Sequence, residues 1–153
     1  MQNNFYKNPL KTLLCNLSEI PNQDSQGFSK CFRGRQAGIM AIRFEKNIFT
    51  YRNKCPHIGS PLDFKPGKFL NADKTYIICS THGALFRIQD GTCVSGPCTG
   101  AALTVVPNIV ENDKIYLMCL DSEGEHSRSK FANFDIPRTD IFPAIFINLA
   151  ISG

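Results

Sequence analysis

Two cysteines and two histidines stand in matching order in two short segments of the chain, each close to a glycine. The first segment is Cys55-Pro56-His57-Ile58-Gly59 and the second is Cys79-Ser80-Thr81-His82-Gly83. Thiolate sulfur and imidazole nitrogen are donors that proteins use for zinc and for some iron–sulfur clusters. Glycine lets the backbone turn closely around a bound group. The four side chains are therefore the candidate ligands of one metal centre.

The residues around these ligands match a known pattern. The first segment continues as CPHIGSPL and the second as CSTHGALFRIQDG, and Ser95-Gly96-Pro97 follows at the place of a proline loop. This combination resembles the Rieske [2Fe–2S] family. The resemblance extends over roughly Leu10 to Leu120.

The resemblance implies a [2Fe–2S] cluster with Cys55 and Cys79 on one iron and His57 and His82 on the other, nearer the surface. Two neutral imidazoles in place of two thiolates reduce the negative charge against which an electron is added, so the potential lies above that of a four-cysteine cluster. The exposed ring nitrogens would be the exit for the electron and could couple its transfer to a proton.

Four positions distinguish this chain from the Rieske proteins of cytochrome bc complexes. Those proteins have a disulfide between the two ligand loops, and a serine and a tyrosine after the second histidine whose hydroxyls bond to sulfur. Ser60 and Thr81 stand at the disulfide positions here, and Ala84 and Phe86 replace the two hydroxyl residues. The resemblance thus predicts no bridge and a low potential, nearer to about −150 mV than to about +300 mV.

Short apolar runs separated by turn residues predict an all-β protein, because the first half of the chain sustains no period of 3.6 residues. The resemblance implies a Rieske-type antiparallel β-sandwich over 10–120, with a small cluster-binding subdomain over about 53–99. A polar linker and an apolar C-terminal tail would occupy 121–153. The sequence predicts a loop over 20–27, an enlarged hairpin within 64–74, and strands at 12–17, 28–33, 38–44, 47–52, 75–78, 103–107 and 114–120.

Composition limits the function classes. The 153 residues carry a formal charge of +4 without a basic block, which argues against nucleic acid as a partner. The seven cysteines do not form the dense framework of a small secreted protein, and no stretch has the roughly 18 apolar residues of a membrane span. With no signal peptide evident, we expect a cytoplasmic protein with mostly inert thiols.

Several alternatives stay open. A structural zinc site would use the same four donors. A complete oxygenase would need two more histidines and a carboxylate for a second iron, and only His126 remains. Cys93 and Cys98, which flank the proline loop, are interpreted as packed thiols, with a regulatory pair as the alternative. Five basic residues around the loops form either a solvated face or a rim for an acidic partner: Arg52, Lys54, Lys65, Lys68 and Arg87.

The resulting hypothesis is a one-electron carrier rather than an enzyme. A flavin-dependent reductase would be its donor and an oxygenase or another terminal enzyme its acceptor. The alternative is a Rieske small subunit bound permanently in a larger oxidoreductase, such as a nitrite reductase. The apolar stretch from Ile141 to Ile151 would dock on the chain's own β domain, contact a partner or second copy, or attach to a membrane surface, so the oligomeric state stays open.

Overall fold

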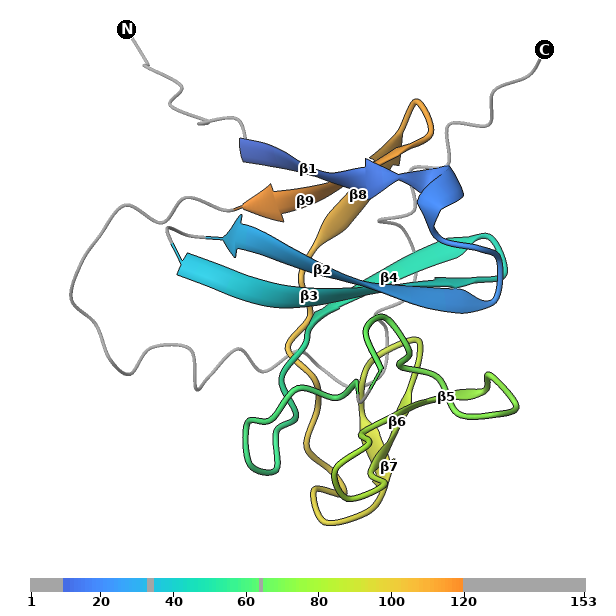
Figure 1. Ribbon diagram of the computed structural model, residues 1–153, viewed down its shortest axis with the longest axis vertical. Helices are drawn as coiled ribbons and strands as arrows, with labels where there is room; N and C mark the ends of the chain where they lie inside the picture. Colours follow the sequence, from blue (N-terminus) through green and yellow to red (C-terminus); the bar gives the residue numbers. More distant parts are fainter. Residues whose placement is uncertain (1–9, 33–34, 64, 120–153) are drawn as a thin grey trace, which may run out of the picture. The chain divides into compact units, whose positions relative to one another are not determined.

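The computed structural model describes residues 10–32, 35–63 and 65–119. Their strands form three antiparallel three-stranded sheets, and the only helical element among them is a single 3-10 turn, η1 (Leu17–Glu19), so the all-β prediction is confirmed (Figure 1). The sheets are ordered β1-β9-β8, β2-β3-β4 and β5-β6-β7. The strands are β1 (Leu10–Asn16), β2 (Asp24–Phe32), β3 (Arg35–Phe44), β4 (Asn47–Arg52), β5 (Tyr76–Ile78), β6 (Leu85–Arg87), β7 (Cys93–Ser95), β8 (Asn108–Glu111) and β9 (Lys114–Cys119).

Strand β3 has a hydrophobic core on each of its faces. Ile39 and Ala41 pack in one buried cluster with residues of the β1-β9-β8 sheet, whereas Met40 and Ile42 pack in a second cluster that reaches the ligand loops. Successive side chains of a strand point to opposite faces, so a continuous apolar run serves both cores. Met40 and Ile42 thereby connect the sandwich to the part of the chain that carries the candidate ligands, which lies below the β2-β3-β4 sheet in Figure 1.

Tyr51 extends this connection from β4. Its side chain is buried, and its hydroxyl donates to the Ile88 carbonyl oxygen at 2.7 Å, beside the turn between β6 and β7. A Cβ atom on Gly91 would lie 2.8 Å from the Tyr51 ring. The glycine is therefore needed for this close approach as well as for its positive φ.

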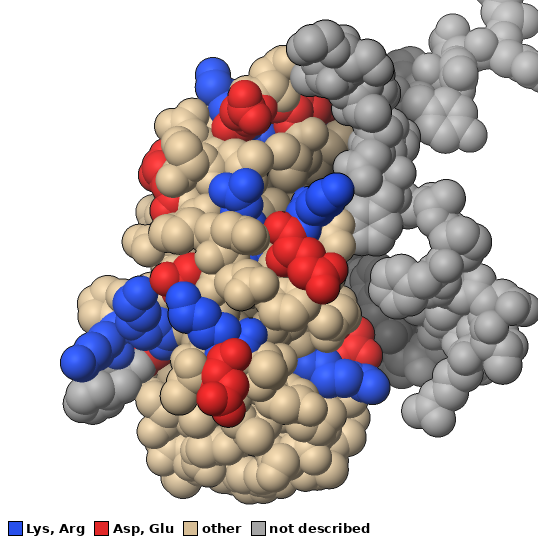
Figure 2. Space-filling view, turned by 90° about the vertical axis from the view of Figure 1, so that its right-hand side faces the viewer, with Lys and Arg blue, Asp and Glu red and all other residues tan. Residues whose placement is uncertain are grey.

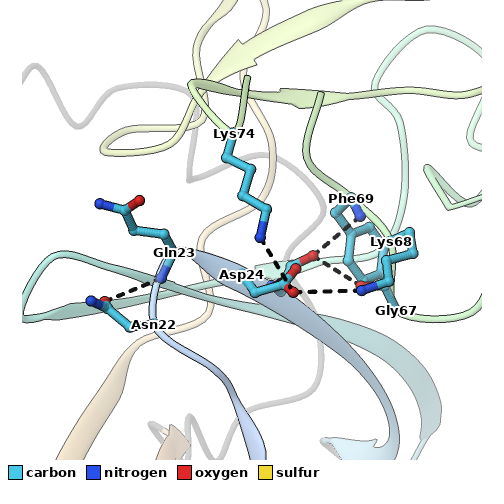
Figure 3. Close-up of polar contacts among 8 residues, drawn as sticks. Asn22, Gln23, Asp24, Gly67, Lys68, Phe69 and Lys74 are labelled. Carbon is cyan, nitrogen blue, oxygen red and sulfur yellow. Dashed lines mark hydrogen bonds and ion pairs between the residues drawn. The ribbon is translucent and has the colours of Figure 1, made fainter. Parts of the chain in front are cut away.

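A second connection lies at the start of β2. The buried Ser25 hydroxyl donates to the Gly67 carbonyl at 2.9 Å and accepts from the Phe69 backbone N–H at 3.2 Å. The neighbouring Asp24 carboxylate lies 3.5 Å from the Lys68 ammonium and 3.6 Å from that of Lys74 (Figure 3). The segment between the two ligand loops is thereby anchored on the sandwich.

Three boundary predictions were wrong. Leu17 belongs to η1 rather than to the first strand, because its backbone N–H bonds to Asp113 in the β8–β9 turn. The loop predicted over 20–27 ends earlier, because β2 begins at Asp24. All residues of β2, including the polar ones at its start, pair with β3. The strand predicted over 103–107 is a single bridge between Tyr51 and Val105. The segment makes too few ladder contacts to form a strand.

The predicted hairpin is confirmed, with Leu70 bridged to Ile77 around a turn. The Asn71 side chain accepts from the backbone N–H groups of Thr75 and Tyr76. No helix in the described part of the chain is long and apolar enough to cross a membrane. The predictions for His126 and for the tail over 141–151 concern residues outside the described part.

Candidate metal centre

The two ligand loops have the same backbone hydrogen-bond pattern. In the first, the Cys55 N–H donates to the Ser60 carbonyl at 2.8 Å and the Gly59 N–H donates to the Cys55 carbonyl at 2.9 Å. In the second, the corresponding bonds join Cys79 to Ala84 and Gly83 to Cys79, at 2.9 and 2.8 Å. Each loop therefore folds back on its own cysteine and presents its histidine at the tip.

Glycine occupies the same position in both loops because the backbone is left-handed there. Gly59 has φ +79° and Gly83 has φ +67°. A Cβ on Gly83 would meet no atom within 4 Å, so its requirement is conformational rather than steric. The signal that the sequence carried in these two glycines thus has a direct structural cause.

The two candidate cysteines are buried beside each other. Cys55 is 2% exposed and Cys79 is 1% exposed. Burial raises the pKa of the Cys55 thiol, and the neighbouring Cys79 adds to that rise. Burial also opposes ionisation of Cys79, but donation from the backbone N–H groups of Thr81 and His82 and from the Cys55 thiol outweighs it and lowers the Cys79 pKa. The Cys79 loop is therefore arranged to favour the thiolate.

The two candidate histidines are exposed and adjacent. The ring centroids of His57 and His82 are 5.0 Å apart, and the rings meet edge to face at 79°. The four donors therefore form a buried sulfur pair and an exposed nitrogen pair. Within the described residues, no three His, Cys, Asp or Glu side chains converge as ligands of one ion. The two-and-two grouping matches the donor set of a [2Fe–2S] cluster with different ligands on each iron.

Hydrogen bonds hold the two loops against each other. The Ser80 backbone N–H and hydroxyl both donate to the Leu62 carbonyl, at 2.9 and 2.7 Å. The Ser60 and Thr81 hydroxyls lie 3.3 Å apart. A hydroxyl pair thus joins the loops at the two positions where the resemblance predicted no disulfide.

The proline loop covers the second ligand loop. A Cβ on Gly96 would lie only 2.7 Å from Cα of Ala84, so this contact requires glycine. Cys93 and Cys98 at the two ends of the loop are buried free thiols with their sulfurs 3.2 Å apart, an arrangement that fits packed thiols and a regulatory pair alike. Burial and the neighbouring Cys93 and Cys55 raise the pKa of Cys98 to about 12.

The basic rim is not a single free cationic surface. Lys68 pairs with Asp24, and the Arg87 guanidinium lies 2.8 Å from the Asp90 carboxylate. The ligand loops and the proline loop themselves contain no charged residue over 55–62, 79–86 and 91–98. The β5-β6-β7 sheet lies at the lower end in Figure 1, and in Figure 2 the lowest part of the visible face carries no charged side chain, although acidic and basic side chains lie directly above it. This arrangement favours the interpretation of a solvated charged face.

Sequence reasoning missed two supporting residues. Tyr51 was only part of a predicted strand, and its contact with Ile88 depends on tertiary packing. Ser25 was only part of a predicted loop, and its contacts with Gly67 and Phe69 were not expected. No local signal reveals either contact, because the partners are more than thirty residues apart in the chain.

The fold and the donor set define an iron–sulfur protein of all-β architecture. A family model for the Rieske [2Fe–2S] domain matches residues 11–112. The chain belongs to the Rieske family, and its cofactor is a [2Fe–2S] cluster. No curated protein matches the chain.

Several solved structures share the fold. The ferredoxin of carbazole 1,9a-dioxygenase from Nocardioides aromaticivorans IC177 is 18% identical with a TM-score of 0.58, over 72% of this chain and 98% of that one. A chain from a complex of reduced oxygenase and oxidized ferredoxin in carbazole 1,9a-dioxygenase is 22% identical with a TM-score of 0.58, over 72% and 94%. The terminal oxygenase from the same Nocardioides strain is 18% identical with a TM-score of 0.60, over 76% and 32%.

Proposed function

We propose that this protein is a low-potential electron carrier that takes single electrons from a flavin-dependent reductase and passes them to an oxygenase or similar terminal enzyme. Cys55 and Cys79 would hold one iron, and His57 and His82 the other. The observation that carries the proposal is the division of the donors into a buried sulfur pair and an exposed imidazole pair. When bound, the cluster accepts and releases one electron.

The residues have separate tasks in this proposal. The buried cysteines keep their sulfurs away from water. In the protein interior, added charge is less screened than in water. The histidines place their ring edges at the surface, which shortens the path to a partner. The apolar side chain of Ile58, the residue directly after His57, is 59% exposed, which suits a contact that excludes water from the tip of the first ligand loop.

A low potential is expected from the residues that face the site. Ala84 and Phe86 are buried and offer no hydroxyl to the sulfur atoms. A hydrogen bond to a charged acceptor contributes roughly 1.5–3 kcal/mol. For one electron, a tenfold change in the equilibrium constant for reduction corresponds to about 59 mV. Losing two such donors therefore favours the lower end of the Rieske range of potentials.

An acceptor of the oxygenase class is supported by the structural neighbours. One of the similar chains comes from a complex of a ferredoxin with its oxygenase. The likeness is one of fold, so the identity of the partner is part of the proposal. We also propose a cytoplasmic location, in keeping with the free thiols among the described cysteines.

Metal analysis combined with a redox titration tests the proposal. We expect two irons and two acid-labile sulfides per chain, a Rieske-type paramagnetic-resonance spectrum after reduction, and a potential nearer to about −150 mV than to about +300 mV. His57→Ala and His82→Ala should abolish that spectrum, whereas Cys31→Ser, at an exposed cysteine away from the loops, should keep it. A colourless zinc protein would overturn the proposal.

A permanently bound subunit or domain is the second candidate. The terminal oxygenases show that this fold also occurs as one part of a longer chain, since the matched region covers 32% of that chain. Native mass measurement after gentle purification separates the two candidates. Stable association with a large catalytic chain would favour the bound subunit over the carrier.

A further inference from the structure

A second pair of cysteines lies near the candidate metal centre and is not part of its donor set. The Cys98 thiol donates to the Cys93 Sγ atom at 3.2 Å, and both residues are free thiols in the structure. A disulfide bond is about 2.0 Å long, so the two sulfurs need to approach by only about 1 Å for the bond to form. The pair is therefore positioned for reversible dithiol–disulfide chemistry.

Backbone hydrogen bonds hold the two cysteines near each other without any bond between their sulfurs. The Cys93 N–H donates to the Ala101 carbonyl at 2.7 Å, and the Cys93 carbonyl accepts from the Gly100 N–H at 3.0 Å. The Ala101 N–H donates in turn to the Cys98 carbonyl at 2.9 Å. Because the folded loop already brings its ends together, most of the entropy of closing this ring is lost before the disulfide forms.

The pair lies at the two ends of the loop that covers the second ligand loop. Gly96 lies between the two cysteines in the sequence, and its contact with Ala84 leaves no room for a side chain. The Thr99 hydroxyl and backbone N–H both donate to the Gly96 carbonyl, at 2.7 and 3.3 Å. Residues 94–97 are exposed, so the loop borders solvent although its two sulfurs are buried. A cross-link between its ends would therefore restrain the segment that separates this part of the site from water.

We propose that Cys93 and Cys98 form a reversible disulfide with a low-molecular-weight disulfide such as oxidised glutathione as the oxidant, and that this bond fixes the proline loop against the second ligand loop. In the exchange, the S–S bond of the small disulfide and the S–H bonds of both cysteines break. The bond between Cys93 and Cys98 forms, and the two protons leave with two molecules of the small thiol. Both cysteines are oxidised, and the small disulfide is reduced.

Exposure and burial set the order and the pace of this exchange. Cys98 is 9% exposed and Cys93 is 2% exposed, so the small disulfide reacts first with Cys98. Cys93 then displaces the small thiol from the mixed disulfide. Buried thiols react slowly, so the pair follows the sustained redox balance of its surroundings rather than a brief exposure to oxidant. Disulfides that form in a reducing compartment are commonly redox-sensing rather than structural.

The first measurement detects the bond in the loaded wild-type protein. Trypsin cleaves after Lys and Arg, so residues 88–114 form one peptide, whose only cysteines are Cys93 and Cys98. After equilibration with oxidised glutathione and alkylation of free thiols in denaturant, we expect this peptide to carry no label and to be lighter by two hydrogens than the dithiol form. Dithiothreitol should restore both labelling sites. A peptide that takes both labels after oxidation, or one that carries glutathione, overturns the proposal.

The second measurement is the rate of cluster loss to an iron chelator, followed by the decay of cluster absorbance after the redox reagents are removed. A short cross-linked loop has fewer open conformations. We expect the half-time of cluster loss to be longer by about threefold or more in the disulfide form than in the dithiol form. Equal half-times overturn the proposed effect on the site.

Matched variants assign the effect to this pair. Cys93→Ser and Cys98→Ser cannot form the bond, so treatment with oxidised glutathione should leave their half-times unchanged. Cys31→Ser removes an exposed cysteine of β2 and should respond as the wild type does. A response that the two serine variants of the pair keep, or that Cys31→Ser loses, overturns the proposal. If a variant of the pair does not fold, the comparison of oxidised and reduced wild type still decides.

The effect on cluster loss rests on the proposed function only in that a cluster must be bound. A wild-type protein without a Rieske spectrum refutes the proposed function, and the peptide measurement still reports on the bond. A wild-type protein that has this spectrum, but whose peptide keeps both labelling sites, refutes only the disulfide.

Discussion

Substitution of Gly96 by alanine tests whether close contact of the proline loop with the second ligand loop stabilises the site. The new Cβ would lie 2.7 Å from Cα and 3.0 Å from Cβ of Ala84, and Gly96 has φ +108°. The backbone conformation alone costs roughly 1–2 kcal/mol for a residue with a side chain. Overpacking adds about 1–3 kcal/mol. The expected total is about 2–5 kcal/mol.

Gly100→Ala is the matched control in the same loop. Gly100 has φ +90°, but its Cβ would meet no atom within 4 Å, so only the conformational cost of roughly 1–2 kcal/mol applies. Urea unfolding of the loaded protein, followed by cluster absorbance and by circular dichroism, measures both variants. With a slope of about 1–3 kcal/mol per molar urea, Gly96→Ala should unfold at a clearly lower midpoint than Gly100→Ala. Equal midpoints would refute the argument from the Ala84 contact.

Three further substitutions test other contacts. The Ser60 and Thr81 hydroxyls lie 3.3 Å apart, so a Ser60→Cys, Thr81→Cys variant should form a disulfide on oxidation. A thiol titration would detect it. The disulfide should add about 3 kcal/mol to the free energy of unfolding. Burial alone would raise the Asp24 pKa, but the Ser25 N–H, Lys68 and Lys74 outweigh burial and lower that pKa. The ionised carboxylate therefore stabilises the fold above its unfolded pKa of about 3.9. This stabilisation is lost as the pH falls through the lower pKa of the folded state. Asp24→Asn should therefore be less stable than the wild type at neutral pH and show a smaller loss of urea midpoint on acidification, and an unchanged acid dependence would contradict this. If the proposed function holds, Ile58→Glu should slow electron transfer to a protein acceptor by about tenfold or more at unchanged potential, whereas Val110→Glu, at a residue 42% exposed on β8, should not.

The sequence by itself was enough to predict the fold class, which the structure confirms, and to select the candidate donors. Cys55, His57, Cys79 and His82 could be selected because their types and spacing are specific, and the nearby glycines satisfy a local backbone requirement. Strand β4 was predicted with its observed bounds, because its turn and apolar run are local signals. Information of this kind lies within a few residues of the chain.

Only the tertiary structure decided which distant groups meet. It places the candidate sulfurs in the interior and the imidazoles at the surface, and it brings Ser25 to Gly67 and Gly96 to Ala84. It also extended β2 over residues whose polar composition predicted a loop, because pairing with β3 satisfies their backbone groups. Contacts across many residues depend on how the sheets pack, and packing is a property of the whole fold rather than of any one segment.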